Sequence, residues 1–532
     1  MELKGQNFVG GGLSCEGGKV FHALNPATSQ QLEPTFHEAT ESEIDRALEL
    51  SVQAFREARE RKLSTAPLLY ALADEIEILG SELIDRAVAE TGLPEARFVG
   101  ERARTVAQIR MFAELVEEGS WVEARIDTSM PDRHPLPKPD LRQMLIPVGP
   151  VVIFGASNFP LAFSVPGGDT ASALAAGNPV VVKAHPAHPG TSELVAIALT
   201  RAVTRSNLPA GFFSMLHGAS YEVGISMVRH PKVEAVGFTG SLAGGRALFD
   251  EAAARDRPIP VYAEMGSINP VFILPSALKE RAADLAQSLH QSITLGVGQF
   301  CTNPGLLVGL KGEGLDELLE SLGKLTSDFP CATMLHAGIR ESYLAGVQHL
   351  AGREGVRVLS HSVSEPDPSR TEVQAAILMT DADTFVSNEE LSHEVFGPST
   401  LVVTCESVEE LEQVADSLEG HLTATVQGDP EDLTKHLKLI TILENRVGRL
   451  IFNGVPTGVE VCPSMHHGGP YPATLDARYT SVGTNAIKRF ARPACYQDFP
   501  DKALPTELRN RNEKNIWRLI DGEFSRESVV AD

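Results

Sequence analysis

The sequence predicts an α/β protein built on parallel sheets, with more than one domain. From about residue 143, short apolar runs of strand length alternate with segments of helix length, which is typical of a parallel sheet covered by helices. Single polar or small residues follow several of these runs, at the strand ends where such sheets bind ligands. The chain has 532 residues, too many for one hydrophobic core, so we expect two or three domains.

The first third of the chain is expected to be mostly helical. Residues 40–60 begin with Thr40, followed three positions later by Glu43, the pattern of a capping box. Apolar residues recur at helical spacing there and in residues 67–92 and 101–121. Residues 129–143 are polar and rich in proline, so we expect an extended connector.

The alternating region comes next. It contains predicted strands within residues 143–157, 178–186, 212–218, 233–241 and 259–266, and predicted helices within residues 170–177, 191–203, 220–230 and 242–255. A second alternating region has strands within residues 269–275, 305–310, 399–405, 421–428 and 446–461. The charged tail after about residue 500 is expected to be partly helical.

The composition excludes several classes of protein. The net charge is -24 and the pI is near 5.1, so a nucleic-acid partner is not expected. No apolar run reaches the roughly 18 residues that a membrane span needs, and the N-terminus has no targeting pattern. The six cysteines include no C-x-x-C pair, which argues against a zinc site or a disulfide framework. We therefore expect a cytoplasmic protein with no metal and no membrane partner.

Several predicted strands end in a small loop with one functional residue. The stretches are "FGASNFP" with Asn158, "VVVKAHP" with Lys183, "VGFTGS" with Gly240 and Ser241, "YAEMGS" with Glu264, "GQFCTNPG" with Cys301, and "HEVFGP" with Glu394 and Phe396. In this order and spacing they resemble the aldehyde dehydrogenase superfamily over residues 20 to 500. The resemblance implies an enzyme, an NAD(P)-dependent aldehyde dehydrogenase that oxidises an aldehyde to a carboxylic acid.

The resemblance also implies the aldehyde dehydrogenase fold. That fold has a Rossmann-like cofactor domain, an α/β catalytic domain and a small β oligomerisation element. We assign residues 1–127 and 148–264 to the dinucleotide-binding domain and residues 265–467 to the catalytic domain. Residues 128–147 and 468–500 form the oligomerisation element, and residues 501–532 form a C-terminal tail. Residues 479–500 would pair with the 128–147 connector, and a homodimer or homotetramer follows.

Three residues are the catalytic candidates. Cys301 would attack the carbonyl to form a thiohemiacetal and then a thioester, because a thiolate in an exposed loop is a strong nucleophile. Glu264 would be the general base, with a pKa raised by its apolar strand end, and its presence favours hydrolysis over transfer to coenzyme A. The Asn158 amide and the backbone N–H of Cys301 would stabilise the oxyanion. The structural alternatives are a buried cysteine, a salt-bridged glutamate and a turn asparagine.

The same resemblance assigns the cofactor residues. Gly240 and Ser241 open a helix whose N-terminus can meet a phosphate, although Ser241 can equally be a plain N-cap. Glu394 would hold the nicotinamide ribose with Phe396 beside it, unless it is an exposed loop acid. The absence of a G-x-G-x-x-G motif agrees with the family.

Lys183 would contact the adenosine ribose. Many relatives that prefer NAD place a glutamate three residues later, where this chain has Pro186. No carboxylate would then oppose a 2'-phosphate, and His185 and His188 are close in sequence. We therefore expect NADP as the preferred cofactor, or NAD as well. The alternative for the two histidines is an ordinary solvated loop.

The substrate is the least determined feature. The chain looks most like a bacterial branch containing 2,5-dioxovalerate (α-ketoglutaric semialdehyde) dehydrogenases and NADP-linked long-chain aldehyde dehydrogenases. The expected reaction is oxidation of 2,5-dioxovalerate to 2-oxoglutarate; the alternatives are a medium-chain, long-chain or generalist aldehyde dehydrogenase, or a non-catalytic binding or structural protein on the same fold. Arg104 could clamp a carboxylate or could be a surface arginine paired with Glu101. The other expected substrate contacts are Phe159 and the loop after Asn453.

Overall fold

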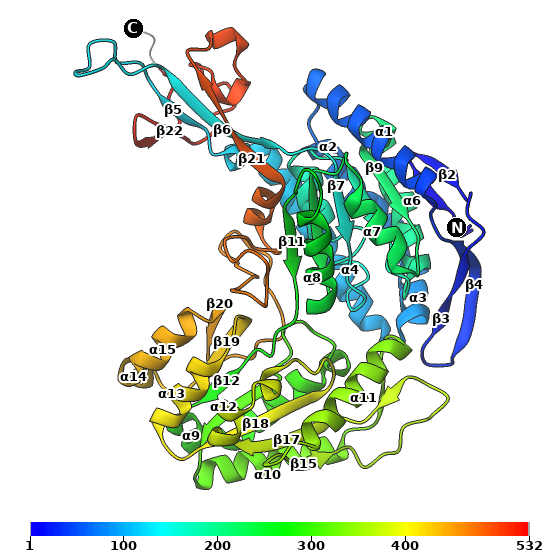
Figure 1. Ribbon diagram of the computed structural model, residues 1–532, viewed down its shortest axis with the longest axis vertical. Helices are drawn as coiled ribbons and strands as arrows, with labels where there is room; N and C mark the ends of the chain where they lie inside the picture. Colours follow the sequence, from blue (N-terminus) through cyan, green and yellow to red (C-terminus); the bar gives the residue numbers. More distant parts are fainter. Residues whose placement is uncertain (1, 530–532) are drawn as a thin grey trace.

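Two seven-stranded sheets and one five-stranded sheet organise the chain, whose computed structural model describes residues 2–529 (Figure 1). The strand order of the first sheet is β11 (Val261–Glu264), β10 (Ala235–Thr239), β7 (Val151–Phe154), β8 (Val180–Lys183), β9 (Phe213–Leu216), β1 (Asn7–Val9), β2 (Gly12–Ser14). The strands from β11 to β9 are parallel, whereas β1 pairs antiparallel with both β9 and β2. The predicted parallel sheet is confirmed.

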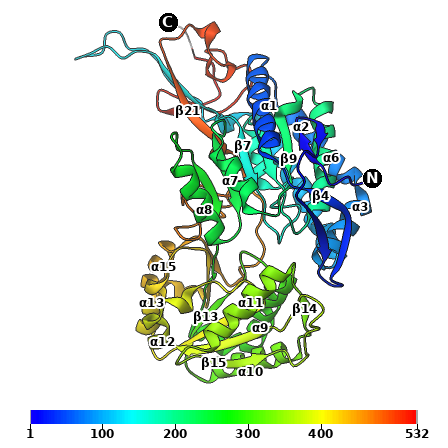
Figure 2. The same cartoon turned by 45° about the vertical axis from the view of Figure 1, so that its right-hand side comes forward.

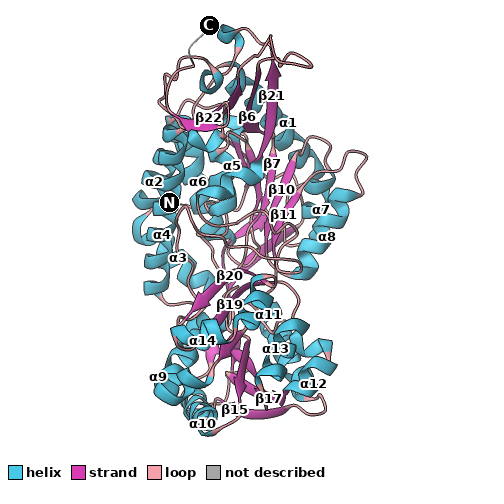
Figure 3. Ribbon diagram, turned by 90° about the vertical axis from the view of Figure 1, so that its left-hand side faces the viewer, coloured by secondary structure: helices cyan, strands magenta, loops and turns pink. Residues whose placement is uncertain are grey.

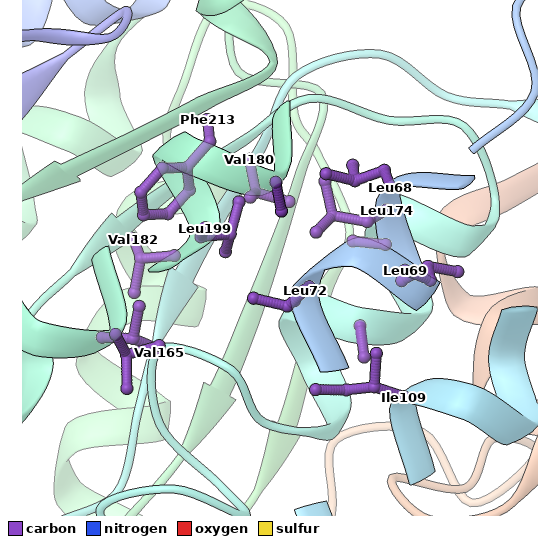
Figure 4. Close-up of a cluster of buried hydrophobic side chains, with 14 of the residues drawn as sticks. Leu68, Leu69, Leu72, Ile109, Val165, Leu174, Val180, Val182, Leu199 and Phe213 are labelled. Atoms are coloured by element: carbon purple, nitrogen blue, oxygen red, sulfur yellow. The ribbon is translucent and has the colours of Figure 1, made fainter. Parts of the chain in front are cut away.

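Helices cover the first sheet. They are α1 (Glu41–Glu60), α2 (Ala66–Ile78), α3 (Gly80–Thr91), α4 (Glu95–Glu118), α5 (Gly168–Ala175), α6 (Pro189–Arg205), α7 (Tyr221–Arg229) and α8 (Leu242–Ala253). Their apolar faces meet the buried strands in one core. Figure 4 shows Leu72 of α2, Ile109 of α4 and Leu199 of α6 gathered around Val180 and Val182 of β8. Val180, Val181 and Val182 are all buried, so β8 is apolar on both faces until its last residue, Lys183.

The second sheet lies beyond the first along the long axis of the molecule (Figure 3). Its strand order is β15 (Arg357–His361), β17 (Ala376–Asp381), β18 (Ser399–Cys405), β13 (Leu306–Leu310), β12 (Val271–Ile273), β19 (His421–Gln427), β20 (Val447–Phe452). All pairs except β15 with β17 are parallel. The helices of this region are α9 (Pro275–Thr294), α10 (Glu313–Asp328), α11 (Ala337–Ala351), α12 (Ala382–Ser387), α13 (Val408–Ser417), α14 (Pro430–Lys435) and α15 (Leu437–Glu444). A two-stranded ladder joins β14 (Ala332–Thr333) to β16 (Glu372–Val373).

The third sheet forms an arm that projects from the body (Figures 1 and 2). Its strand order is β21 (Ala491–Gln497), β6 (Leu141–Pro147), β5 (Arg125–Asp127), β22 (Arg518–Ile520), β23 (Glu523–Ser525). The expected pairing of the 479–500 segment with the connector is confirmed, because β21 runs antiparallel to β6 along its whole length. The tail, expected to be partly helical, contains two short 3-10 turns and contributes β22 and β23 to this sheet.

Strands precede the helices of the first third, which the helical prediction missed. Besides β1 and β2, the hairpin of β3 (Val20–Asn25) and β4 (Gln30–His37) runs along the side of the body toward α11 (Figure 1). At its turn, the carbonyl of Pro26 accepts a hydrogen bond from the Thr371 N–H. β1 and β2 have three residues each, and β1 is held by β9, about two hundred residues away, so no local periodicity marks β1.

The chain crosses twice between the two large sheets. It leaves the first sheet at Glu264 and enters the second at Val271. After β20 it returns through residues 453–490, which end in η5 (Thr484–Phe490), and Thr474 forms an isolated bridge to Glu264. This return segment therefore lies against the end of β11. Within residues 2–529, no helix has the length and apolar character needed to cross a membrane.

Candidate active site

The predicted residues of the first sheet gather at one edge. Register aligns Phe154 of β7 with Lys183 of β8 on one side and with Phe238 of β10 on the other, and Thr239 with Glu264 of β11. The carboxyl ends of these parallel strands therefore share an edge, where such sheets bind ligands. In sheet order this edge carries Glu264, Gly240, Asn158 and Lys183.

The Cys301 loop follows α9 through η3 (Leu295–Gly298) in an unusual backbone conformation. Val297 and Gly298 have φ of 60° and 65°, in the left-handed region that favours glycine. A Cβ atom on Gly298 would lie 2.3 Å from the carbonyl carbon of Gly397, so no larger residue fits there. The turn places Cys301 where the two sheets meet.

Asn269 anchors this loop, and the sequence analysis missed it. Its Nδ2 group faces the carbonyl oxygens of Cys301 at 2.8 Å and Asn303 at 2.9 Å. Its Oδ1 atom accepts hydrogen bonds from the hydroxyls of Ser267 at 2.9 Å and Thr423 at 3.0 Å. The residue is fully buried and has φ of 47°, a conformation that asparagine tolerates better than most residues. Asn269 thus fixes the backbone that presents the thiol.

The thiol, an imidazole and a carboxylate form a compact cluster. The Nε2 atom of His467 lies 3.5 Å from Cys301 Sγ and 3.0 Å from Glu264 Oε1. The other oxygen of Glu264 accepts a short hydrogen bond from the Ser481 hydroxyl. Both His467 and Ser481 come from the return segment, and neither was a sequence candidate. The "HHGG" stretch was assigned only to a wall, and two adjacent histidines would have been the signal to examine.

Cys301 differs from the exposed thiolate that the sequence suggested. It is half-buried, and burial together with the adjacent Glu264 carboxylate raises the pKa of the thiol well above its ordinary value. The resting sulfur is therefore a thiol at neutral pH. Its activation requires a base in contact, and His467 is in contact.

The predicted upward shift of the Glu264 pKa is wrong. Burial raises the pKa of this carboxyl, but the charge and hydrogen bond of His467 and the hydroxyl of Ser481 outweigh burial, so the net pKa is lowered. Glu264 is only 4% exposed. The sequence argument considered the apolar strand and did not include the polar neighbours that the return segment supplies.

Asn158 lies beside the thiol loop, as expected of an oxyanion donor. Its Nδ2 group donates to the Gln299 carbonyl at 3.0 Å, two residues before Cys301. An amide nitrogen carries two N–H donors, so one remains for a ligand. The carbonyl of Asn158 accepts a hydrogen bond of 3.0 Å from Arg97. This network holds the Asn158 turn against the thiol loop.

Three aromatic rings, together with arginines of α4, line the approach to the thiol. Phe159 packs edge to face on Phe163 and on Phe300, with 5.2 Å between centroids in both pairs. The guanidinium of Arg97 lies 4.2 Å from the centroid of Phe159 and 4.6 Å from that of Phe300. Phe159 therefore lies where a substrate contact was expected, and Arg97 is an additional cation that the sequence analysis missed.

Arg104 lies two turns after Arg97 on α4. Its guanidinium is 5.3 Å from the centroid of Phe163, and its Nη1 atom is buried with no hydrogen-bond partner among the described residues. Burial lowers the pKa of Arg104, and the negative charge of Glu101 opposes that shift. Arg104 is half-buried and not on the surface, and the Glu101 carboxylate of the alternative pairing does act on its charge.

Arg449 and Asn453 belong to β20 and the turn after it. Arg449 donates to the carbonyls of Gly458 at 3.2 Å and Pro456 at 2.9 Å, which ties down the loop after the strand. Its Nε atom is buried without a partner among the described residues. The side chain of Asn453, expected at the substrate, instead hydrogen-bonds the backbone of Gly428 and the Arg281 guanidinium. The structure does not bring Asn453 into the thiol cluster.

The loop after β8 is less open than a solvated loop. His188 is buried, 3.1 Å from the Ala156 carbonyl, and its ring stacks on His185 with 5.3 Å between centroids. Burial lowers the pKa values of both histidines, so they are neutral at neutral pH and supply no positive charge for a phosphate. Pro186 lies between them, half-buried.

Lys183 has one nearby carboxylate that the sequence analysis did not anticipate. Burial lowers the pKa of Lys183 to about 8, and the negative charge of Glu38 opposes that lowering. Glu38 accepts hydrogen bonds from the Ala219 N–H at 3.2 Å and the Ser220 hydroxyl at 2.9 Å. A carboxylate therefore does lie near the expected adenosine ribose position, although not at residue 186.

The remaining dinucleotide candidates fit a phosphate and a ribose. Ser241 is the N-cap of α8, because its Oγ accepts a hydrogen bond from the Gly244 N–H at 3.2 Å. The other N–H groups at the N-terminus of this helix are those that would bind a phosphate. Glu394 is exposed, as the alternative of a loop acid expected, and yet desolvation raises its pKa to about 7; its Oε1 accepts from the Ser267 N–H at 3.3 Å. A Cβ on Gly266 would lie 2.7 Å from Glu394 Oε2, so glycine leaves room for that carboxylate. Phe396 lines the same small cavity as Glu394.

One edge of a parallel sheet carries the candidate dinucleotide-binding residues. This edge faces a thiol that is in contact with a histidine and a carboxylate. Together these features are those of a cysteine-dependent, dinucleotide-linked oxidoreductase. The comparison of sequences adds the family. The aldehyde dehydrogenase family model matches residues 14–476, and the chain belongs to that family. It is accordingly an NAD(P)-dependent oxidoreductase that acts on aldehydes.

Two relatives and one solved structure give the degree of similarity. The chain is 48% identical over 527 residues to "Alpha-ketoglutaric semialdehyde dehydrogenase 2" of Azospirillum brasilense, covering 98% of this chain and 100% of the relative. It is 42% identical over 531 residues to "Alpha-ketoglutaric semialdehyde dehydrogenase" of Acinetobacter baylyi, covering 99% of each. An NAD+ complex of an aldehyde dehydrogenase from Bacillus cereus superposes with a TM-score of 0.79 at 21% identity, over 92% of this chain and 96% of the other. That structure supports the predicted fold.

Proposed function

We propose that this enzyme oxidises 2,5-dioxovalerate (α-ketoglutaric semialdehyde) to 2-oxoglutarate. The observation that carries the proposal is Arg104, whose buried Nη1 has no partner among the described residues and faces the thiol site. A substrate carboxylate beyond the aldehyde would satisfy that donor with a charge-assisted hydrogen bond. The printed names of the two relatives support the same substrate.

The first chemical step is attack by the thiol. His467 Nε2, in its unprotonated form, takes the thiol proton across 3.5 Å, and the N–H so formed donates to Glu264 Oε1 at 3.0 Å, which stabilises the positive charge of the imidazole. The free N–H of Asn158 and the backbone N–H of Cys301 then stabilise the oxyanion of the thiohemiacetal. Both donors are already held in place, so little reorganisation is needed.

The dinucleotide fits the edge formed by Lys183, Ser241 and Glu394, and when bound it supplies the hydride acceptor. The chain's own residues then complete the reaction. A small cavity lined by Glu264, His467 and Ser481 has room for a water molecule beside the carboxylate. Glu264, ionised because its pKa is lowered, takes a proton from that water as it attacks the thioester. The Cys301 sulfur leaves as a thiolate and takes back the proton held by His467, the proton on Glu264 passes to solvent, and the product is a free acid.

We propose NADP as the preferred dinucleotide, with NAD as the second candidate. Pro186 places no carboxylate three residues after Lys183, which favours NADP. Glu38, whose charge acts on Lys183, is the specific observation that favours NAD. The two cofactors differ by a 2'-phosphate, so the charge near Lys183 decides between them.

A second substrate class has its own supporting observation. Phe159, Phe163 and Phe300 form an apolar aromatic wall, and Val459, Val461 and Met465 pack against the same cluster. Such a lining would suit a medium-chain or long-chain aldehyde. The reading as a non-catalytic protein has no such support, because the thiol, imidazole and carboxylate are in contact.

Steady-state kinetics test the proposal. The values of kcat/KM for 2,5-dioxovalerate and for hexanal are measured with NADP and with NAD. A preference for 2,5-dioxovalerate that disappears in Arg104→Leu supports the carboxylate clamp. Equal or higher kcat/KM for hexanal in the parent enzyme would reject 2,5-dioxovalerate in favour of the apolar class.

The projecting arm supports assembly as a homodimer or homotetramer. β6 and β21 extend away from the body, and the arm carries the exposed apolar residues Met130 and Leu136. The edge strand β20 carries exposed Leu450 and Phe452, a second apolar surface. Light scattering coupled to gel filtration would measure the mass of the assembly.

A further inference from the structure

Three metal-binding side chains meet at the thiol site. Cys301 Sγ, His467 Nε2 and a carboxylate oxygen of Glu264 all lie within 4.8 Å of one another. The donors come from three distant segments: the end of β11, the loop after η3 and the return segment. Local ligand spacing, which argued against a zinc site, does not detect donors assembled in this way.

The donor spacing matches a tetrahedral cation. With ordinary Zn–S, Zn–N and Zn–O bond lengths, tetrahedral angles place sulfur and nitrogen about 3.6 Å apart and nitrogen and oxygen about 3.3 Å apart. The observed distances are 3.5 Å from Sγ to Nε2 and 3.0 Å from Nε2 to Oε1. A thiolate, an imidazole and a carboxylate are also a ligand set that zinc accepts, and three protein ligands leave a fourth position open.

We propose that the enzyme without aldehyde binds one thiophilic divalent cation, represented by Zn2+, through Cys301, His467 and Glu264, and that this binding inhibits it reversibly. The cation takes the place of the thiol proton, which leaves to solvent, and no redox step occurs. The thiolate and the carboxylate together neutralise the charge of the cation. The metal occupies the sulfur lone pair needed for attack on the aldehyde, so metal binding and acylation exclude each other.

The surroundings make this an inhibitory site of moderate affinity. Ser481 holds one oxygen of Glu264, and the other, Oε1, lies 3.0 Å from His467 Nε2, so a metal would replace this contact between two of its own ligands. The Nδ1 atom of His467 is buried without a partner among the described residues, whereas a metal-bound histidine usually donates that N–H to an acceptor. The guanidinium of Arg104, whose charge interacts with Cys301 and Glu264, also opposes additional positive charge at the thiol. Both features weaken binding relative to a structural zinc site and permit removal by a chelator.

Metal binding can be measured without any turnover. Full-length enzyme is treated with a chelator, and Zn2+ binding is then followed by equilibrium dialysis with metal analysis. Co2+ is used as a second probe, because thiolate ligation gives an ultraviolet charge-transfer band. We expect one Zn2+ per chain and a thiolate-to-cobalt band. Cys301→Ser should abolish the band, and His467→Gln and Glu264→Gln should weaken Zn2+ binding by more than the roughly 10- to 100-fold loss typical of second-shell changes.

Matched controls and a second measurement keep the test independent of folding and of the substrate. His466→Gln changes the adjacent histidine and Cys331→Ser a cysteine elsewhere, and both should bind Zn2+ like the parent. In the parent, Zn2+ should slow alkylation of Cys301 by iodoacetamide, read by peptide mass spectrometry. Unchanged Zn2+ binding in Cys301→Ser, or alkylation at an unchanged rate under saturating Zn2+, would overturn the proposal. Neither result depends on which aldehyde the enzyme oxidises.

Discussion

Cys301 and His467 are 166 residues apart in the sequence, and their Sγ and Nε2 atoms are 3.5 Å apart in the structure. The contact pairs a thiol whose pKa is raised with a base that can take its proton. Because Glu264 adjoins both groups, each of the three should have a distinct kinetic signature.

His467→Gln should slow acylation. The amide keeps a hydrogen-bonding side chain but cannot accept the thiol proton at neutral pH, and a general base typically contributes about 100- to 10,000-fold. The pre-steady-state rate of NAD(P)H formation should decrease by a factor within that range. The rate should recover partly at high pH, because the thiol then ionises without a base. His466→Gln is the control. A parent-like burst rate in His467→Gln would mean that another group activates Cys301.

Glu264→Gln should affect the second half of the reaction. Without a carboxylate to activate water, the thioester should accumulate, giving a burst of NAD(P)H followed by slow turnover. In the parent the pKa of Glu264 is lowered, so the carboxylate stays ionised across the neutral range and deacylation should not decline until well into acid. Rapid-quench detection of acyl-enzyme, with Cys301→Ala as the blank, checks this. Deacylation at the parent rate would assign the base elsewhere.

Arg104→Leu should separate the two substrate classes. Loss of a charge-assisted pair in a partly buried site costs about 2–4 kcal/mol, so kcat/KM for 2,5-dioxovalerate should fall roughly 30- to 1000-fold. Activity on hexanal should hold or rise. Arg110→Leu, on the same helix but exposed and paired with Asp74 and Glu77, is the matched control. If both aldehydes lose activity equally, Arg104 is structural.

Two substitutions near Lys183 should shift cofactor preference in opposite directions. Pro186→Glu adds a carboxylate facing a 2'-phosphate and should move the ratio of kcat/KM values toward NAD by about 5- to 150-fold, equivalent to about 1–3 kcal/mol. Glu38→Gln removes an existing negative charge and should move the ratio toward NADP. The ratio is measured with one aldehyde at fixed ionic strength, since charge effects are screened by salt. No change in either variant would place the ribose pocket elsewhere.

Dinucleotide affinity should depend on pH through Glu394. Its pKa is raised to about 7, so the carboxylate is ionised above that pH and protonated below it. Only the ionised form accepts hydrogen bonds from both ribose hydroxyls, so the Kd should rise as the pH falls from 8 to 6. Glu394→Gln should bind more weakly at pH 8 and show a flat profile. Fluorescence titration measures both, and a parent Kd that does not change with pH would remove Glu394 from the ribose site.

The fold was largely predictable because its strands are short, apolar and separated by helices. Glu264 at the end of β11 and Asn158 after β7 were candidates because the motifs that contain them resemble those of the family, and the structure places both beside the Cys301 loop. His467, Ser481 and Asn269 were not predicted, because their roles come from long-range contacts with no local signal. The same contacts explain the wrong pKa direction for Glu264. The expected substrate contact of Asn453 was not found for a related reason: its side chain hydrogen-bonds the backbone of Gly428.

The return segment has a consequence for biosynthesis. The ribosome adds Cys301 to the chain long before His467. At ordinary elongation rates, the synthesis of the 166 residues between them takes about 8–33 s. Throughout that interval the nascent chain holds its nucleophile without its proton acceptor. On the proposed mechanism, the thiol becomes competent for attack only when residues 453–490 fold back against β11. Catalytic activity is therefore acquired near the end of translation, and an incomplete chain carries an unactivated cysteine.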